Sequence, residues 1–139
     1  MASKGQLTGM TGAFLVAAQL SARRLIASTT SRSAAGADIL VTDAECRVVF
    51  SVQVKTNSKP ASFWLLGKNQ PPKGSDSHIY AFVNLVVNES GDVTGDYYLV
   101  PSRVVSKIAV FGGDTWPVYS VYKGKIEKYH NDWTIFNSR

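Results

Sequence analysis

Two short apolar segments separated by a polar turn constrain the fold of this chain more than any other feature. Residues 38–41 read Asp-Ile-Leu-Val, and residues 48–55 read Val-Val-Phe-Ser-Val-Gln-Val-Lys. The residues between them, at 43–47, are suited to the turn of a β-hairpin. We therefore expect two neighbouring antiparallel strands here.

Three polar residues stand out within this hairpin. Side chains two positions apart in a strand point to the same side of the sheet, so Gln53 and Lys55 share a face, while Val52 and Val54 point to the other. The hairpin brings Asp38 alongside them. A carboxylate that can hold a divalent cation then lies beside an ammonium that can orient a water or neutralise a phosphate. This combination suits the hydrolysis of a phosphodiester.

Each of these residues also has a structural explanation when taken singly. A Gly-x-Asp sequence before a strand is common turn chemistry, and an alternating strand often shows polar side chains to water. Taken together, the three residues favour a functional site, because the polar pair Gln53 and Lys55 interrupts an otherwise apolar sheet.

The order of these features resembles the PD-(D/E)XK nuclease superfamily: a helix, a short connection, a Gly-x-Asp strand, a turn, and a strand ending in Gln-x-Lys. Within it, the chain is similar to the small prokaryotic endonucleases related to archaeal Holliday-junction resolvases. The resemblance extends through 80–85 and 97–102, which resemble the next two strands, and covers about 8–110. It implies an α/β (α+β) fold with a restriction-endonuclease-like core, in which helices flank a central mixed sheet of about four to five strands.

The resemblance also implies roles for the residues of the hairpin. Asp38 becomes a metal ligand and Gln53 takes the position of the second ligand. The carbonyl of Val54 joins them, and Lys55 becomes the catalytic ammonium that contacts the attacking water or the scissile phosphate. The implied cofactor is Mg²⁺ or Mn²⁺, and the implied substrate is DNA.

The sequence departs from the family pattern at two positions. Many relatives carry a Gly-Glu pair on the first helix, whereas the matching pair here is Gly12-Ala13, and alanine cannot bind a metal. Gln53 offers a neutral oxygen where many members have Glu. These residues suit one weakly held Mg²⁺ rather than a clamp of two metal ions.

Composition is consistent with a polyanionic partner. The chain has 15 Lys and Arg against 10 Asp and Glu, giving a net charge of +5. No dense basic run is present, so any basic face must be assembled by folding. The candidates for contacts with nucleic acid are Arg23, Arg24, Arg32 and Lys59.

Length and composition indicate a single globular domain over residues 1–139, with a C-terminal extension at 111–139. The single Cys46 excludes an intrachain disulfide and favours a reducing, cytoplasmic location. No apolar run is long enough to cross a membrane. The first 37 residues contain no Asp or Glu, as in transit peptides, but the resemblance makes them the first helix of the fold.

Periodicity predicts that this first helix runs from about 7 to 28, capped by Thr8 or Thr11. Its expected core stripe consists of Leu7, Met10, Phe14, Ala17, Ala18 and Leu25. Within the long insert at 57–77, we expect Trp64 to anchor the segment against the core. The alternative is that Trp64 stacks on an unpaired base.

In the second half of the chain, apolar patterns predict a buried central strand at 79–87 and a further strand at 96–100. Ser102 is expected to cap a helix at 103–110. The aromatic tail at 116–139 is expected to add a last strand and a short helix over the sheet.

Three functions follow from these observations. The first is a metal-dependent endonuclease that hydrolyses DNA, with branched, Holliday-junction-like DNA as one substrate. The second is a catalytically impaired nuclease fold that only binds nucleic acid. The third is a homo-oligomeric interaction protein, such as a homodimer with the C-terminal aromatic residues as its interface.

Overall fold

The computed structural model describes residues 3–30, 38–67 and 74–137. The first helix, α1, spans Lys4–Ala22 and begins with a capping box. The Ser3 hydroxyl accepts a hydrogen bond from the Gln6 N–H, and the Gln6 side chain accepts one from the Ser3 N–H. The predicted caps at Thr8 and Thr11 were therefore wrong.

The helix also ends earlier than its sequence pattern predicts. Arg24 adopts a left-handed conformation with φ of 67°, and the Leu25 N–H donates back to the Leu20 carbonyl. This turn ends the helix and directs the chain into strand β1, which spans Ile26–Thr29. The prediction of helix as far as residue 28 was wrong, because a local turn stops it.

Five strands form the main sheet, in the order β1-β2-β3-β5-β6. Only β3 and β5 run parallel, and the other neighbours are antiparallel. The expected mixed sheet flanked by helices is thus confirmed, with β5 as the buried strand next to the edge strand β6. The remaining strands span Ile39–Thr42 (β2), Val48–Asn57 (β3), His78–Val87 (β5) and Val93–Pro101 (β6).

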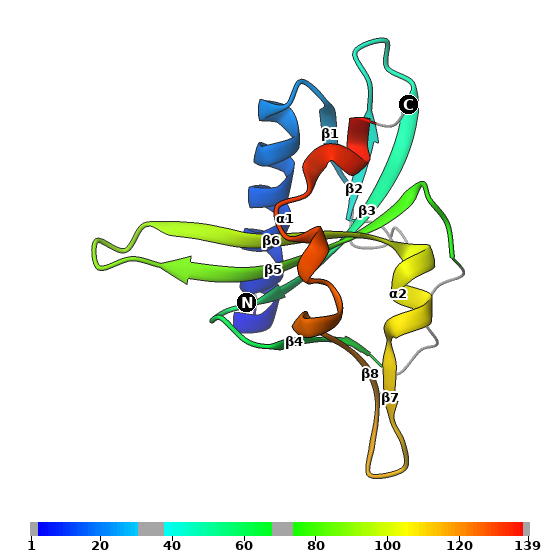
Figure 1. Cartoon of the computed structure of the whole chain (residues 1–139). Helices are drawn as coiled ribbons and strands as arrows, with labels where there is room; N and C mark the ends of the chain where they lie inside the picture. Colours follow the sequence, from blue (N-terminus) through cyan, green and yellow to red (C-terminus); the bar gives the residue numbers. More distant parts are fainter. Residues whose placement is uncertain (1–2, 31–37, 68–73, 138–139) are drawn as a thin grey trace.

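A second, three-stranded sheet was not expected from the sequence. Its order is β4-β8-β7, so the strand from the long insert pairs with a strand from the C-terminal third. The hairpin of β7 and β8 projects from the molecule, as does the hairpin of β5 and β6 (Figure 1). The strands are Phe63–Gly67 (β4), Val110–Gly112 (β7) and Trp116–Tyr122 (β8).

Helix α2, at Ser102–Ile108, follows β6 directly (Figure 1). Its N-cap position is Pro101, which provides no side-chain hydrogen bond, and the helix ends at Ile108 rather than at residue 110. Ser102 is the first helical residue instead of the predicted cap. The described part of the chain ends in three short 3₁₀ segments, at Lys123–Lys125 (η1), Glu127–Tyr129 (η2) and Trp133–Asn137 (η3).

The two faces of the main sheet are covered by different elements. On one face, Val16 and Leu20 of α1 pack with Val52 of β3, and η3 completes this core. On the other face, the second sheet and α2 cover the half of the sheet formed by β5 and β6. Trp64 is only 1% exposed there, and its indole N–H donates to the Val83 carbonyl, so the predicted core anchor is confirmed.

The rotation of α1 about its axis differs from the prediction. Its buried residues are Gly12, Val16 and Leu20, whereas the predicted core residues Leu7, Met10 and Phe14 are about half exposed. A close contact explains the difference. A Cβ at residue 12 would lie 1.9 Å from Oγ1 of the β3 residue Thr56, so α1 can lie this close to β3 only because residue 12 is glycine.

Among the residues that the structure describes, no helix combines the length and the apolar character needed to cross a membrane.

Candidate functional site

Asp38 immediately precedes β2, and its backbone groups hold it in place. Its N–H donates to the Val52 carbonyl and its carbonyl accepts from the Thr30 N–H, both at 2.8 Å. The next residue, Ile39, pairs with Val52, and both are buried against α1. Because side chains alternate along a strand, Asp38 and its neighbour Gln53 belong to the opposite face of the sheet.

The carboxylate of Asp38 has one oxygen engaged and one free. Oδ2 accepts a hydrogen bond from the Val54 N–H at 2.8 Å. Within the described part of the chain, Oδ1 has no hydrogen-bond partner. The carboxylate is therefore held in place by β3 while one oxygen remains available to a ligand.

Gln53 and Lys55 project from β3 on the same face, and both side chains are half-buried. Burial lowers the pKa of Lys55, and the nearby negative charge of Asp38 partly opposes this change. The structure thus brings together three of the residues that the sequence singled out. A half-buried ammonium and a carboxylate face the same space.

The backbone carbonyl of Val54 points toward the same edge of β3. Alternate residues of a strand direct their backbone groups to the same side, and the Val52 carbonyl already accepts from Asp38 on that side. The candidate ligand oxygens on this part of β2 and β3 belong to one carboxylate, one amide and one carbonyl, which are ligands that Mg²⁺ accepts.

The acidic side chains that the structure describes form no metal-binding cluster around this set. Within residues 3–30, 38–67 and 74–137, no three His, Cys, Asp or Glu side chains are grouped in a way that could hold a metal ion. Asp43 is engaged by the hairpin turn, where it accepts hydrogen bonds from the backbone N–H groups of Glu45 and Arg47. The donor set therefore fits one Mg²⁺ with several waters and does not fit a pair of metal ions.

The candidate site lies on the part of this face that the second sheet and α2 do not cover. The second sheet and α2 lie over β5 and β6, whereas Leu40 of β2, on the same face, is 38% exposed. Tyr80 of β5 is the register partner of Gln53 and is 4% exposed. Burial raises the pKa of Tyr80 to about 12, so this neighbour is a neutral phenol.

Two further polar side chains on this face were not singled out from the sequence. Ser51 and His78 are register partners on β3 and β5, and the Ser51 hydroxyl lies 2.6 Å from Nδ1 of His78. The His78 ring meets the Tyr80 ring edge-on, and burial lowers the pKa of His78. The signal available in the sequence was the i–2 spacing of Ser51 from Gln53. This spacing does not predict that His78 lies beside Ser51, because β5 follows β3 only after a long insert.

Among the predicted nucleic-acid contacts, Arg23 lies on the other side of the sheet. The Arg23 guanidinium lies 4.5 Å above the ring of Trp133 and also donates to the Gln19 side chain, on the side covered by α1. Arg24 is exposed in the turn after α1, and Lys59 is exposed in the connection between β3 and β4. Arg32 lies outside the described residues.

Ala13, at the position where the resemblance places an acid, is half-buried on α1, which covers the other face of the sheet.

Comparisons with known proteins identify a fold and no family. No family model matches the chain, and no curated protein matches it. Among solved structures, the chain is similar to a bacterial homing endonuclease, I-Ssp6803I, with a TM-score of 0.59 and 16% sequence identity. The match covers 98% of this chain and 92% of the endonuclease, so nearly all of the chain takes part in the shared fold.

Proposed function

We propose that this protein is a metal-dependent endonuclease of the PD-(D/E)XK type that hydrolyses DNA. The observation that supports this most directly is the Asp38 carboxylate held by Val54, beside Lys55 on a face open to solvent. The fold shared with a bacterial homing endonuclease supports it independently of the site. The resemblance to resolvase-like enzymes makes branched DNA the substrate to test beside linear DNA.

In this proposal, Asp38, the Val54 carbonyl and Gln53 hold one Mg²⁺ or Mn²⁺. When bound, such an ion polarises the phosphate and lowers the pKa of its water. The chain supplies the positioning. The Val54 N–H fixes the direction of the Asp38 carboxylate before any ligand arrives, and this reduces the reorganisation needed on binding.

Lys55 supplies positive charge where negative charge grows during hydrolysis. Its ammonium is half-buried, so water screens it less than a surface lysine, and its effect on a phosphate is correspondingly stronger. The carboxylate of Asp38 partly offsets the lowering of its pKa by burial and so favours the charged form.

The test is incubation of the purified protein with supercoiled and branched DNA in Mg²⁺ and in Mn²⁺. We expect nicking by the wild type, and none by the Asp38→Ala and Lys55→Ala variants. Lys55→Ala should still bind DNA, because most of the affinity comes from other phosphate contacts. Lys125→Ala, which removes an exposed lysine of η1, is the matched control and should cut normally. Equal cutting by Lys55→Ala would refute its assignment.

A second candidate is a nuclease fold that binds nucleic acid without cutting it. Two observations favour this reading. The described residues form no cluster of three His, Cys, Asp or Glu side chains, and Ala13 lies on the helix that covers the other face of the sheet. DNA binding in the presence of a chelator, together with no cleavage under any divalent metal, would establish it.

A third candidate is self-association. Trp116 is 56% exposed and Tyr122 is 48% exposed on β8, so aromatic surface is available to a second copy of the chain. Absence of binding to DNA and RNA at low salt, with a dimer in sedimentation, would favour this candidate.

A further inference from the structure

The Ser51–His78 pair lies one step along the sheet from the proposed site. Residues two apart in a strand are separated by about 6.6 Å, so Ser51 lies that far from Gln53 on the same face. His78 is the register partner of Ser51 on β5 and lies two residues before Tyr80, the partner of Gln53. This separation is comparable to that between neighbouring phosphates of one nucleic-acid strand.

In every protonation state of His78, the pair has at least one N–H or O–H donor that the Ser51–His78 hydrogen bond does not use. If the Ser51 hydroxyl donates to Nδ1, the Nε2–H of His78 is left over. If Nδ1–H donates to Ser51, the hydroxyl hydrogen is left over. Protonated His78 leaves both. Within the described residues, neither side chain has a second hydrogen-bond partner, so the spare donor is unused.

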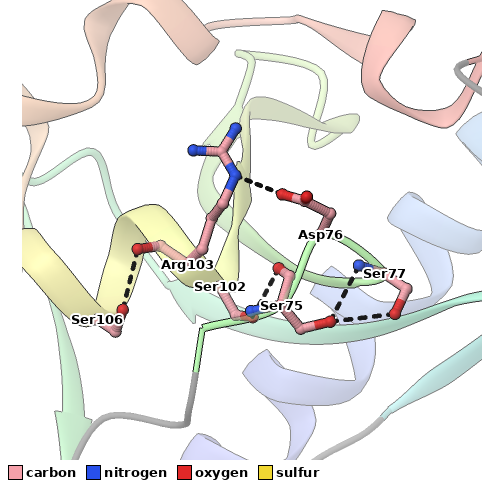
Figure 2. A network of polar contacts seen from close by, with 6 residues as sticks. All are labelled: Ser75, Asp76, Ser77, Ser102, Arg103 and Ser106. Atoms are coloured by element: carbon pink, nitrogen blue, oxygen red, sulfur yellow. Dashed lines mark hydrogen bonds and ion pairs between the residues drawn. The ribbon is translucent and has the colours of Figure 1, made fainter.

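The segment that leads into His78 is held firmly. The Ser75 N–H donates to the Ser102 hydroxyl, which in turn donates to the Ser75 carbonyl, both at 3.0 Å (Figure 2). Arg103 pairs with Asp76 in the same network (Figure 2). A Cβ at residue 74 would lie 2.8 Å from the Cα of Arg103, so the segment also runs tightly against α2. The start of β5 is therefore fixed relative to the helix.

We propose that Ser51 and His78 form a second phosphate-binding subsite, which takes the phosphodiester next to the one held beside Asp38 and Lys55. This inference rests on the proposed function, because it requires a nucleic-acid strand to lie along this face of the sheet. The subsite fixes the register of the strand, and the reacting phosphate remains at the other position.

The experiment scans the phosphates of a bound DNA strand one at a time. Each phosphate of a short oligonucleotide is replaced by a neutral methylphosphonate, and the Kd is measured by fluorescence anisotropy in a chelator. Loss of one hydrogen bond to a charged group predicts a rise in Kd of about tenfold at one position for the wild type. In Ser51→Ala and in His78→Gln, that same replacement should no longer raise the Kd.

His130→Gln is the matched control, because His130 pairs with Asp96 on β6, away from β3, and should retain the wild-type profile. If His78→Gln does not fold, the conservative Ser51→Ala carries the test alone. An unchanged profile in the variants overturns the subsite and leaves the proposed function standing if nicking still depends on Asp38. A wild-type protein that binds no DNA overturns both.

Discussion

The carboxylate of Asp38 accepts a hydrogen bond from the backbone N–H of Val54, two residues beyond the last paired position of the hairpin. The side chain thus continues the pairing of β2 and β3 where the backbone of β2 has ended. The same contact aims the carboxylate at the face that carries Lys55. One hydrogen bond therefore serves both the hairpin and the candidate site.

The first prediction separates these two contributions. Asp38→Asn retains an oxygen that can accept from Val54, so its free energy of unfolding should stay within about 0.5 kcal/mol of the wild type. Asp38→Ala removes the acceptor and should cost about 1–2 kcal/mol. Both variants should lose Mg²⁺ binding and nicking. Urea unfolding measures the first effect, and equal stability losses in the two variants would contradict it.

The second prediction concerns the contact between α1 and β3. Gly12→Ala places a Cβ within 1.9 Å of the Thr56 hydroxyl, so the helix must move, and we expect a loss of about 1–3 kcal/mol in the free energy of unfolding. The double variant with Thr56→Gly should recover much of this loss, because the obstructing atoms are gone. A double variant no more stable than Gly12→Ala would show that the contact is not the cause.

Gly9→Ala is the matched control for this experiment. It lies on the same helix, and a Cβ there would meet nothing within 4 Å. Alanine is the better helix former, so this variant should gain about 0.5–1 kcal/mol in thermal or urea unfolding. A loss of stability would mean that this face of α1 is not free.

The third prediction concerns the link between β5 and α2. Ser102 is fully buried, and its hydroxyl accepts from the Ser75 N–H and donates to the Ser75 carbonyl. Ser102→Ala leaves the half-buried Ser75 N–H without this acceptor, while the carbonyl keeps the longer 3.4 Å bond from the Arg103 N–H. We expect a loss of about 1–3 kcal/mol. Ser106→Ala, whose hydroxyl bonds only to the Arg103 carbonyl of its own helix, should change stability little. Differential scanning calorimetry compares the two variants, and equal effects would refute the link.

The fourth prediction follows from the raised pKa of Tyr80. Below pH 10 the phenol is neutral in both states and has no effect on the pH dependence. Between pH 10 and the folded value of about 12, the unfolded chain loses the proton first, so stability falls as pH rises, by up to about 1.4 kcal/mol per pH unit.

Tyr80→Phe should therefore flatten the alkaline decline in Tm relative to the wild type. Tyr122→Phe, at an exposed position, is the control and should leave the slope unchanged. The same steep decline in Tyr80→Phe would show that other tyrosines determine it.

The hairpin could be predicted because its information is local. The alternation at Val52–Lys55 determines which side chains share a face, and the turn at 43–47 determines which strands become neighbours. In the structure, the Asp43 N–H donates to the Arg47 carbonyl and closes that turn. Buried strand β5 was also predictable, because a nearly continuous apolar run has few alternatives.

What could not be predicted depends on contacts between distant segments. The stripe of Leu7, Met10 and Phe14 has the correct period for a core face, yet the close contact at Gly12 turns it outward. His78 was missed for a related reason. Its place beside Ser51 comes from a parallel pairing across residues 58–77, and hydrophobic patterns carry no information about such a partner.

The pairing of β4 with β8 has a consequence for how the chain folds as the ribosome makes it. Trp64 and the strand around it are synthesised first, and the backbone partner at Trp116–Tyr122 follows roughly fifty residues later. Until then β4 lacks its partner strand in the second sheet, and the indole lacks part of its apolar cover. The hairpin of β2 and β3 can therefore form during synthesis well before the second sheet does.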